Sequence, residues 1–96
     1  MTIDDLLREK REEILRLAAK HGALNVRVFG SAARGEADDR SDIDLLVDLE
    51  PDRSLLDLGG LWADLNAMLP VEIDVVTEKG LRDSIRQRVL KEAIPL

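Results

Sequence analysis

The sequence predicts a small α/β (α+β) domain in which helices pack on one mixed β-sheet of three to four strands. Three short segments have the period-two alternation of strands, and three longer segments repeat apolar residues at helical spacing. Their order along the chain is α-β-β-α-β-α, and two helices on one face of the sheet make a plausible core. The 96 residues leave room for one domain, which we assign to residues 1–96.

The first two elements have clear boundary signals. Residues 2–21 predict a helix that Thr2 caps and Gly22 ends, with one apolar stripe and an opposite charged face. Residues 25–29 predict a valine-rich strand that ends at Gly30. A helix followed by a strand is therefore expected at the start of the domain.

The second strand has one apolar face and one mainly acidic face. Residues 31–41 form a polar loop, and residues 42–49 predict a strand that ends at Pro51. Alternation divides this strand into an apolar set (Ile43, Leu45, Val47 and Leu49) and a second set (Asp42, Asp44, Leu46 and Asp48). Burial of the apolar set is expected to anchor the strand and thereby to fix the position of the acids on its opposite face.

The remaining elements are a helix, a strand and a closing helix. Residues 54–69 predict a helix, although Gly59-Gly60 costs about 1 kcal/mol per glycine and is expected to break it into two pieces. Residues 71–77 predict the third strand, and residues 81–93 the last helix.

The composition excludes several classes of protein. Hydrophobic residues make up 45% of the chain and charged residues 35%, which excludes a disordered tail. The absence of cysteine excludes disulfides and thiolate metal sites, and it fits a cytoplasmic location. No apolar run approaches a membrane span, and the N-terminus lacks a signal-peptide pattern. A net charge of −6 disfavours general nucleic-acid binding but suits a basic partner or a cation site.

Asp42 and Asp44 are the first candidates for chemistry. Two residues apart on a strand, they project from the same face about 6.6–7 Å apart along the backbone, so both can reach one hard cation or bridge two. Magnesium takes oxygen ligands of this kind. Asp48 lies about 13 Å further along this face, too far to share the ion. The alternative is an edge strand whose solvated acids discourage aggregation.

Nearby residues favour a phosphate and metal site. Gly30 permits close backbone approach and Ser31 adds a hydroxyl donor, although an ordinary strand-ending turn would look similar. Arg34 and, less strongly, Arg40 can clamp phosphate oxygens through the guanidinium. The alternative for these arginines is a salt bridge to the nearby acids Asp38 or Asp39.

The third strand offers another acid. If it lies beside the second strand, Asp74 joins the face of Asp42 and Asp44, whereas another register would bring Glu72 there instead. We favour Asp74. Three clustered carboxylates repel each other unless a cation is bound, so the cluster indicates an ion site.

Taken together, these motifs resemble those of the nucleotidyltransferase superfamily related to DNA polymerase beta, and in particular its minimal nucleotidyltransferase branch. The resemblance is carried by Phe29-Gly30-Ser31-Ala32-Ala33-Arg34-Gly35, by Ser41-Asp42-Ile43-Asp44-Leu45-Leu46-Val47 and by the closing stretch Leu90-Lys91-Glu92-Ala93-Ile94-Pro95-Leu96.

The resemblance implies an activity and a role for each residue. Gly30 and Ser31 would hold the triphosphate of ATP, and Asp42 and Asp44 would ligate magnesium, with two ions present when the nucleotide is bound. Asp74 matches the third acid, which helps to activate the acceptor hydroxyl. Members of this branch are commonly antitoxins paired with a helical HEPN-domain toxin, and some transfer AMP to a tyrosine hydroxyl of that partner.

Three other functions stay open from the sequence. The chain would be a non-catalytic antitoxin if it neutralised its partner by binding alone. Transfer to a small molecule such as an aminoglycoside is disfavoured, because so short a chain has no acceptor domain. A structural domain with solvated acids is the last alternative.

Overall fold

The structure is a computed structural model that describes residues 2–36 and 42–96. Its elements are α1 (Ile3–Lys20), β1 (Ala23–Phe29), β2 (Ile43–Leu49), α2 (Leu55–Met68), β3 (Ile73–Thr77), the 3-10 helix η1 (Glu78–Gly80), α3 (Asp83–Glu92) and β4 (Ile94–Pro95). The predicted order α-β-β-α-β-α is confirmed, and η1 and the two-residue strand β4 are additions to it.

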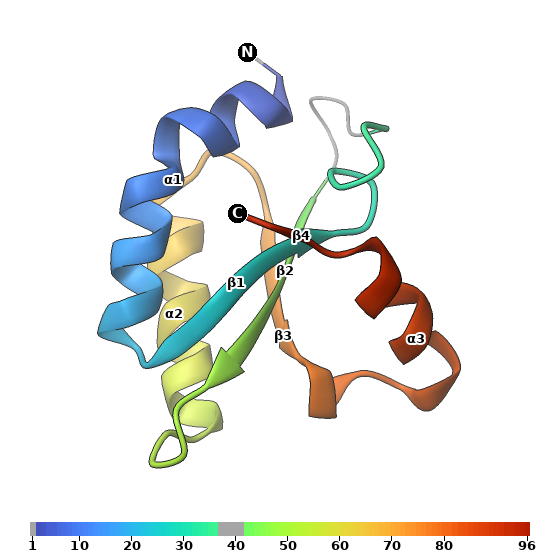
Figure 1. Cartoon of the computed structure of the whole chain (residues 1–96). Helices are drawn as coiled ribbons and strands as arrows, with labels where there is room; N and C mark the ends of the chain where they lie inside the picture. The colour runs from blue at the N-terminus through green and yellow to red at the C-terminus, as the bar shows by residue number, and fades with distance from the viewer. Residues whose placement is uncertain (1, 37–41) are drawn as a thin grey trace.

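The strands form one mixed sheet in the order β3-β2-β1-β4 (Figure 1). Strand β1 is antiparallel to both β2 and β4, whereas β2 and β3 are parallel. The β1–β2 ladder shifts register between Leu24 and Arg27, where Asn25 adopts a φ of 52°. The central position of β2 fixes its acids between two neighbouring strands, so β2 is not the solvated edge strand that sequence analysis left open.

Helices cover both faces of the sheet. Helices α1 and α2 pack on one face, over Ile43, Leu45 and Val47 of β2, and this packing confirms the predicted pair of helices. On the other face Leu46 is fully buried in a smaller cluster with Leu81 and Val89, which the α3 segment supplies (Figure 1). The acids of β2 therefore lie on the face that α3 partly covers.

Capping residues start two of the helices. Thr2 and Ser54 each form a capping box, with Asp5 and Asp57 as the reciprocal partners. The predicted break at Gly59-Gly60 is wrong: α2 is continuous from Leu55 to Met68, because buried Leu61 and Leu65 pack it onto the sheet. None of the helices in residues 2–36 and 42–96 combines the length and apolar character that a bilayer span requires.

Candidate active site

Asp44 and Asp74 lie side by side on the two parallel strands. The register pairs Asp44 with Asp74 and Ile43 with Ile73. Paired residues of adjacent strands project from the same face, so both carboxylates face the side of the sheet opposite the core of α1 and α2. Ile43 and Ile73 are buried in that core and anchor both strands. The structure thus brings Asp74, and not Glu72, beside Asp44.

The acids make this end of the sheet strongly negative. Burial raises the pKa of the Asp44 carboxyl, and the nearby charges of Asp74 and then Asp42 raise it further. Asp44 is half-buried, whereas Asp42 and Asp74 are exposed. Arg34 acts in the opposite direction and lowers the pKa of Asp44. Keeping Asp44 ionised is therefore unfavourable in free energy, and a bound cation would offset that unfavourable term.

Gly30 lies directly against the Asp44 carboxylate. Strand β1 ends at Phe29, which pairs with Asp44, and Gly30 follows with a φ of 74°. A Cβ at position 30 would lie 2.4 Å from Oδ2 of Asp44. The chain then turns, with the Glu36 amide donating to the Ser31 carbonyl at 2.9 Å. Both the backbone conformation and the close contact require glycine, and Ser31 follows as the next residue of the turn.

Arg34 is held by two carboxylates near Asp44. Its Nε donates to Glu36 Oε2 at 2.9 Å, and its Nη1 donates to Glu92 on α3. The hydrogen bond to Glu36 is the main cause of a raised Arg34 pKa. Arg40 and the alternative partners Asp38 and Asp39 lie outside the described residues.

Glu92 is the residue that sequence analysis missed. It is largely buried against Arg34, although 58 residues separate the two in the chain. Its charge also raises the pKa of Asp44. Its position in the closing stretch Leu90–Leu96, which resembles the family, was the only sequence feature that pointed to Glu92. That feature does not indicate which residue the Glu92 side chain contacts. The structure shows that Glu92 reaches the site from α3.

The other end of the sheet has different chemistry. Asp48 accepts hydrogen bonds from Arg27 Nη2 at 3.0 Å and from Asn25 Nδ2 at 3.1 Å. It is therefore a salt-bridge partner remote from Asp44, as its spacing predicted. A cavity of about 830 Å³ lies at this end, between Asp48 and Thr77 at the carboxyl ends of β2 and β3. That cavity does not include the acids of the candidate site.

The donor set fits magnesium bound together with a nucleotide. In residues 2–36 and 42–96, no three His, Cys, Asp or Glu side chains form a group that could hold a metal by themselves. The structure therefore brings together the pair Asp44 and Asp74, with Asp42 at its edge, instead of the expected closed cluster of three. Magnesium is usually held by one or two carboxylates, with waters and substrate phosphates as further ligands. Two hard oxygen donors next to a glycine turn meet that requirement.

Comparison with known sequences identifies relatives over nearly the whole chain. The family model described as "Nucleotidyltransferase domain" matches residues 7–96. A Methanocaldococcus jannaschii protein, provisionally named a protein adenylyltransferase, is 38% identical over 88 residues, which are 92% of this chain and 95% of that protein. Protein adenylyltransferase MntA of Thermococcus cleftensis is 37% identical over 92 residues, which are 96% of this chain and 90% of that protein.

Solved structures share the fold. One that is described provisionally as a minimal nucleotidyltransferase is 52% identical, with a TM-score of 0.86 over 100% of this chain and 97% of that chain. A toxin–antitoxin structure with AMP-PNP has a TM-score of 0.73 at 21% identity, over 88% of this chain and 69% of that chain. At that identity the likeness concerns the fold alone.

Proposed function

This chain belongs to the nucleotidyltransferase domain family, and from that premise we propose that it is an antitoxin that transfers AMP from ATP to a hydroxyl group of a toxin partner. The observation that carries the proposal is the in-register pair of Asp44 and Asp74 beside Gly30. The relatives named protein adenylyltransferases support transfer to a protein. The antitoxin role and the nucleotide follow from the resemblance of the glycine turn and the acidic strand to the minimal nucleotidyltransferase branch, and the toxin–antitoxin structure with AMP-PNP shares the fold.

Asp42, Asp44 and Asp74 would hold magnesium, as two ions when the nucleotide is present. The bound metal supplies neutralisation of the charge on the α-phosphate and on the leaving pyrophosphate. Asp44 is the central ligand, since it lies between the other two acids and its pKa responds to both. The repulsion among the acids is the physical reason for a cation here.

The glycine turn and Arg34 orient the triphosphate. Gly30 has no side chain, so the phosphates can approach the backbone next to Asp44. Ser31 offers its amide and hydroxyl as donors at the same turn. Arg34 donates through Nε and Nη1 to Glu36 and Glu92, and its Nη2 is the donor that we assign to a phosphate oxygen.

The acceptor is a tyrosine hydroxyl on a helical HEPN-type toxin. Asp74 is exposed, so an acceptor on another chain can reach it, and we assign the acceptor proton to its carboxylate. A tyrosine hydroxyl, with a pKa of about 10, gives up that proton more easily than an aliphatic hydroxyl. This assignment explains why an exposed acid lies beside the half-buried Asp44.

Incubation with α-labelled ATP, magnesium and a purified HEPN-type protein from the same genome tests the proposal. We expect label on the partner with wild type and none with Asp42→Ala/Asp44→Ala. Asp48→Ala is the matched control, because it removes the same side chain from the same strand face but at the end paired with Arg27. It should label the partner like wild type.

A non-catalytic antitoxin is the second candidate. It predicts no label on the partner, together with equal neutralisation of the toxin by wild type and Asp42→Ala/Asp44→Ala. Binding of the double variant to the partner, measured in parallel, separates loss of chemistry from loss of the complex.

A further inference from the structure

Helix α2 exposes a continuous apolar face. Leu55 and Leu56 are 76% and 88% exposed, and the single tryptophan, Trp62, is 50% exposed. Gly59 and Ala63 are exposed as well, and helical spacing places all five residues on one side of the helix. Single exposed leucines are ordinary on a protein surface, whereas several exposed apolar residues side by side indicate an interaction site. We refer to these five residues as the α2 stripe.

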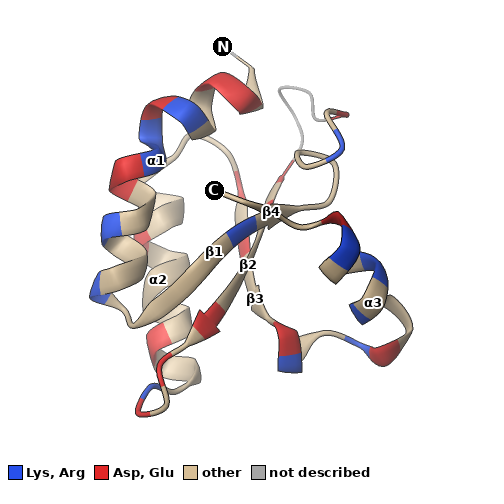
Figure 2. Ribbon diagram, viewed as in Figure 1, with Lys and Arg blue, Asp and Glu red and all other residues tan. Residues whose placement is uncertain are grey.

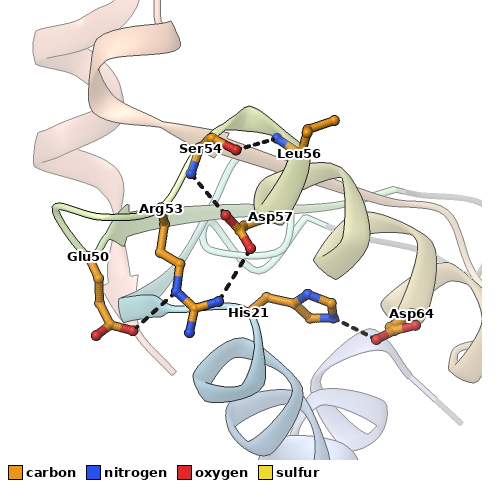
Figure 3. A network of polar contacts seen from close by, with 7 residues as sticks. All are labelled: His21, Glu50, Arg53, Ser54, Leu56, Asp57 and Asp64. Atoms are coloured by element: carbon orange, nitrogen blue, oxygen red, sulfur yellow. Dashed lines mark hydrogen bonds and ion pairs between the residues drawn. The ribbon is translucent and has the colours of Figure 1, made fainter.

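The charges of α2 are directed away from this stripe. Asp57 accepts from Arg53 at 3.3 Å, and Asp64 bonds to His21 at 2.6 Å (Figure 3). Asp64 also accepts from Lys20 at 3.4 Å. The helix contains no lysine or arginine, so its ribbon is mostly tan in Figure 2. The α2 stripe itself carries no ionisable side chain, although the chain as a whole has a net charge of −6.

No contact within residues 2–36 and 42–96 explains Gly59. A Cβ at position 59 would meet no described atom within 4 Å beyond its own stretch of helix, whereas one at Gly60 would lie 2.9 Å from the His21 ring. Glycine inside a helix is unfavourable relative to alanine. His21 accounts for Gly60, whereas no contact among the described residues requires glycine at position 59, where a second helix could approach closely.

We propose that the α2 stripe binds the α2 stripe of a second copy of this chain, with the two helices antiparallel about a two-fold axis at Gly59. This pairing places Gly59 against Gly59, Leu55 against Ala63 and Leu56 against Trp62. Leu55 thus meets the small Ala63, and Leu56 packs against the Trp62 ring, at either side of a helix crossing at Gly59. Such a self-complementary patch is what a two-fold interface requires.

The self-complementary order of the α2 stripe favours a second copy as the occupant, and the lack of charge on the stripe permits one. Two molecules of net charge −6 repel each other wherever their acids meet. The α2 stripe avoids this repulsion, since Asp57 and Asp64 are paired within their own chain. A partner chosen through its basic surface would find no acid on this face to bind.

This inference is independent of the proposed function. The stripe lies on the outer side of α2, which covers the sheet face opposite Asp44 and Asp74. Pairing through α2 therefore leaves both sites of the dimer open. An experiment can therefore contradict the proposed dimer without contradicting AMP transfer, and the reverse.

Sedimentation equilibrium of the whole chain over a range of concentrations tests the pairing, with Trp62 emission as a local probe. We expect a concentration-dependent dimer and a blue shift of Trp62 emission as it forms. Leu56→Lys should raise the dimer dissociation constant about tenfold or more, because it places an unpaired charge in the interface. Leu24→Lys is the matched control: Leu24 is 51% exposed on β1, outside the stripe, and should leave the dimer unchanged.

Gly59→Leu provides a second variant. It adds a helix-forming side chain in open space, so the monomer should unfold at a higher temperature while the dimer is lost. A wild-type chain that stays monomeric would overturn the proposal, as would a dimer that Leu56→Lys and Gly59→Leu leave intact. A Trp62 blue shift that appears only when the toxin partner is added would also overturn it.

Discussion

The Asp44 carboxylate occupies the space that a side chain at Gly30 would need, with Oδ2 2.4 Å from the position of that Cβ. Gly30→Ala should therefore displace the carboxylate and abolish AMP transfer. Gly35→Ala is the control, since Gly35 has a similar φ of 71° but no atom of residues 2–36 and 42–96 outside its immediate chain neighbours would lie within 4 Å of its Cβ. Both variants should lose about 1–3 kcal/mol of unfolding free energy from backbone strain. Equal activity in the two variants would show that the Asp44 contact is unimportant.

Asp44→Asn should stabilise the metal-free protein while inactivating it. Burial and the charges of Asp74 and Asp42 raise the pKa of Asp44. A raised pKa means that stability from this group is present below the unfolded pKa of about 3.9 and is lost as pH rises through the folded value. Thermal unfolding without magnesium should give Asp44→Asn a higher Tm than wild type at neutral pH. The advantage should disappear in acid, and a lower Tm of the variant at neutral pH would contradict this prediction.

Arg34 should contribute to ATP binding, with Glu92 as its positioning residue. Losing one charge-assisted hydrogen bond costs about 1.5–3 kcal/mol, so Arg34→Ala should raise the KM for ATP about tenfold or more. Glu92→Gln should act in the same direction but less, since Glu36 still holds the guanidinium. Steady-state kinetics and urea unfolding together check this. If Arg34→Ala unfolds more easily but keeps the wild-type KM for ATP, Arg34 serves only as an ion-pair partner of Glu36 and Glu92.

Strand periodicity predicted much of the fold, including the apolar and acidic faces of β2. Alternation alone separated Ile43, Leu45 and Val47 from Asp42 and Asp44, because period two is a property of the strand itself. The register between β2 and β3 depends on how two distant segments pack, so the sequence left Glu72 and Asp74 as alternatives. The structure pairs Asp44 with Asp74.

Long-range contacts were beyond the sequence. Glu92 reaches Arg34 only because α3 folds back over the second face of the sheet. The glycine pair of α2 was expected to break the helix, but local propensity is small against the burial of Leu61 and Leu65. Tertiary packing decided both outcomes.

Asp64 should stabilise the fold in a pH-dependent way. The hydrogen bond from His21 is the main cause of a lowered Asp64 pKa, and Lys20 adds to it. A lowered carboxyl pKa gives stability that is present above the unfolded pKa of about 3.9 and is lost as pH falls through the folded value. Asp64→Asn should therefore lower the Tm at neutral pH but not in strong acid. Glu9→Gln, an equal charge removal on the exposed face of α1, should cause a smaller change, and an equal change would contradict the prediction.

Alanine at the two adjacent glycines of α2 should have opposite effects on stability. Gly59→Ala fills open space and should add about 1 kcal/mol of unfolding free energy. Gly60→Ala gains the same helix propensity, but its Cβ would lie 2.9 Å from His21 Cε1 and 3.0 Å from Nδ1, so the ring must move. That movement disturbs the 2.6 Å contact of His21 with Asp64, and the net effect should be destabilising.

Urea unfolding at a protein concentration below that of any dimer measures both effects, and a double-mutant cycle locates the second. In an Asp64→Ala background the His21 ring has no partner to lose, so Gly60→Ala should cost less there than in wild type. The effect of Gly59→Ala should be the same in both backgrounds, because the added Cβ would contact neither His21 nor Asp64. An equal cost of Gly60→Ala with and without Asp64 would mean that the clash acts on helix packing and not through the His21–Asp64 bond.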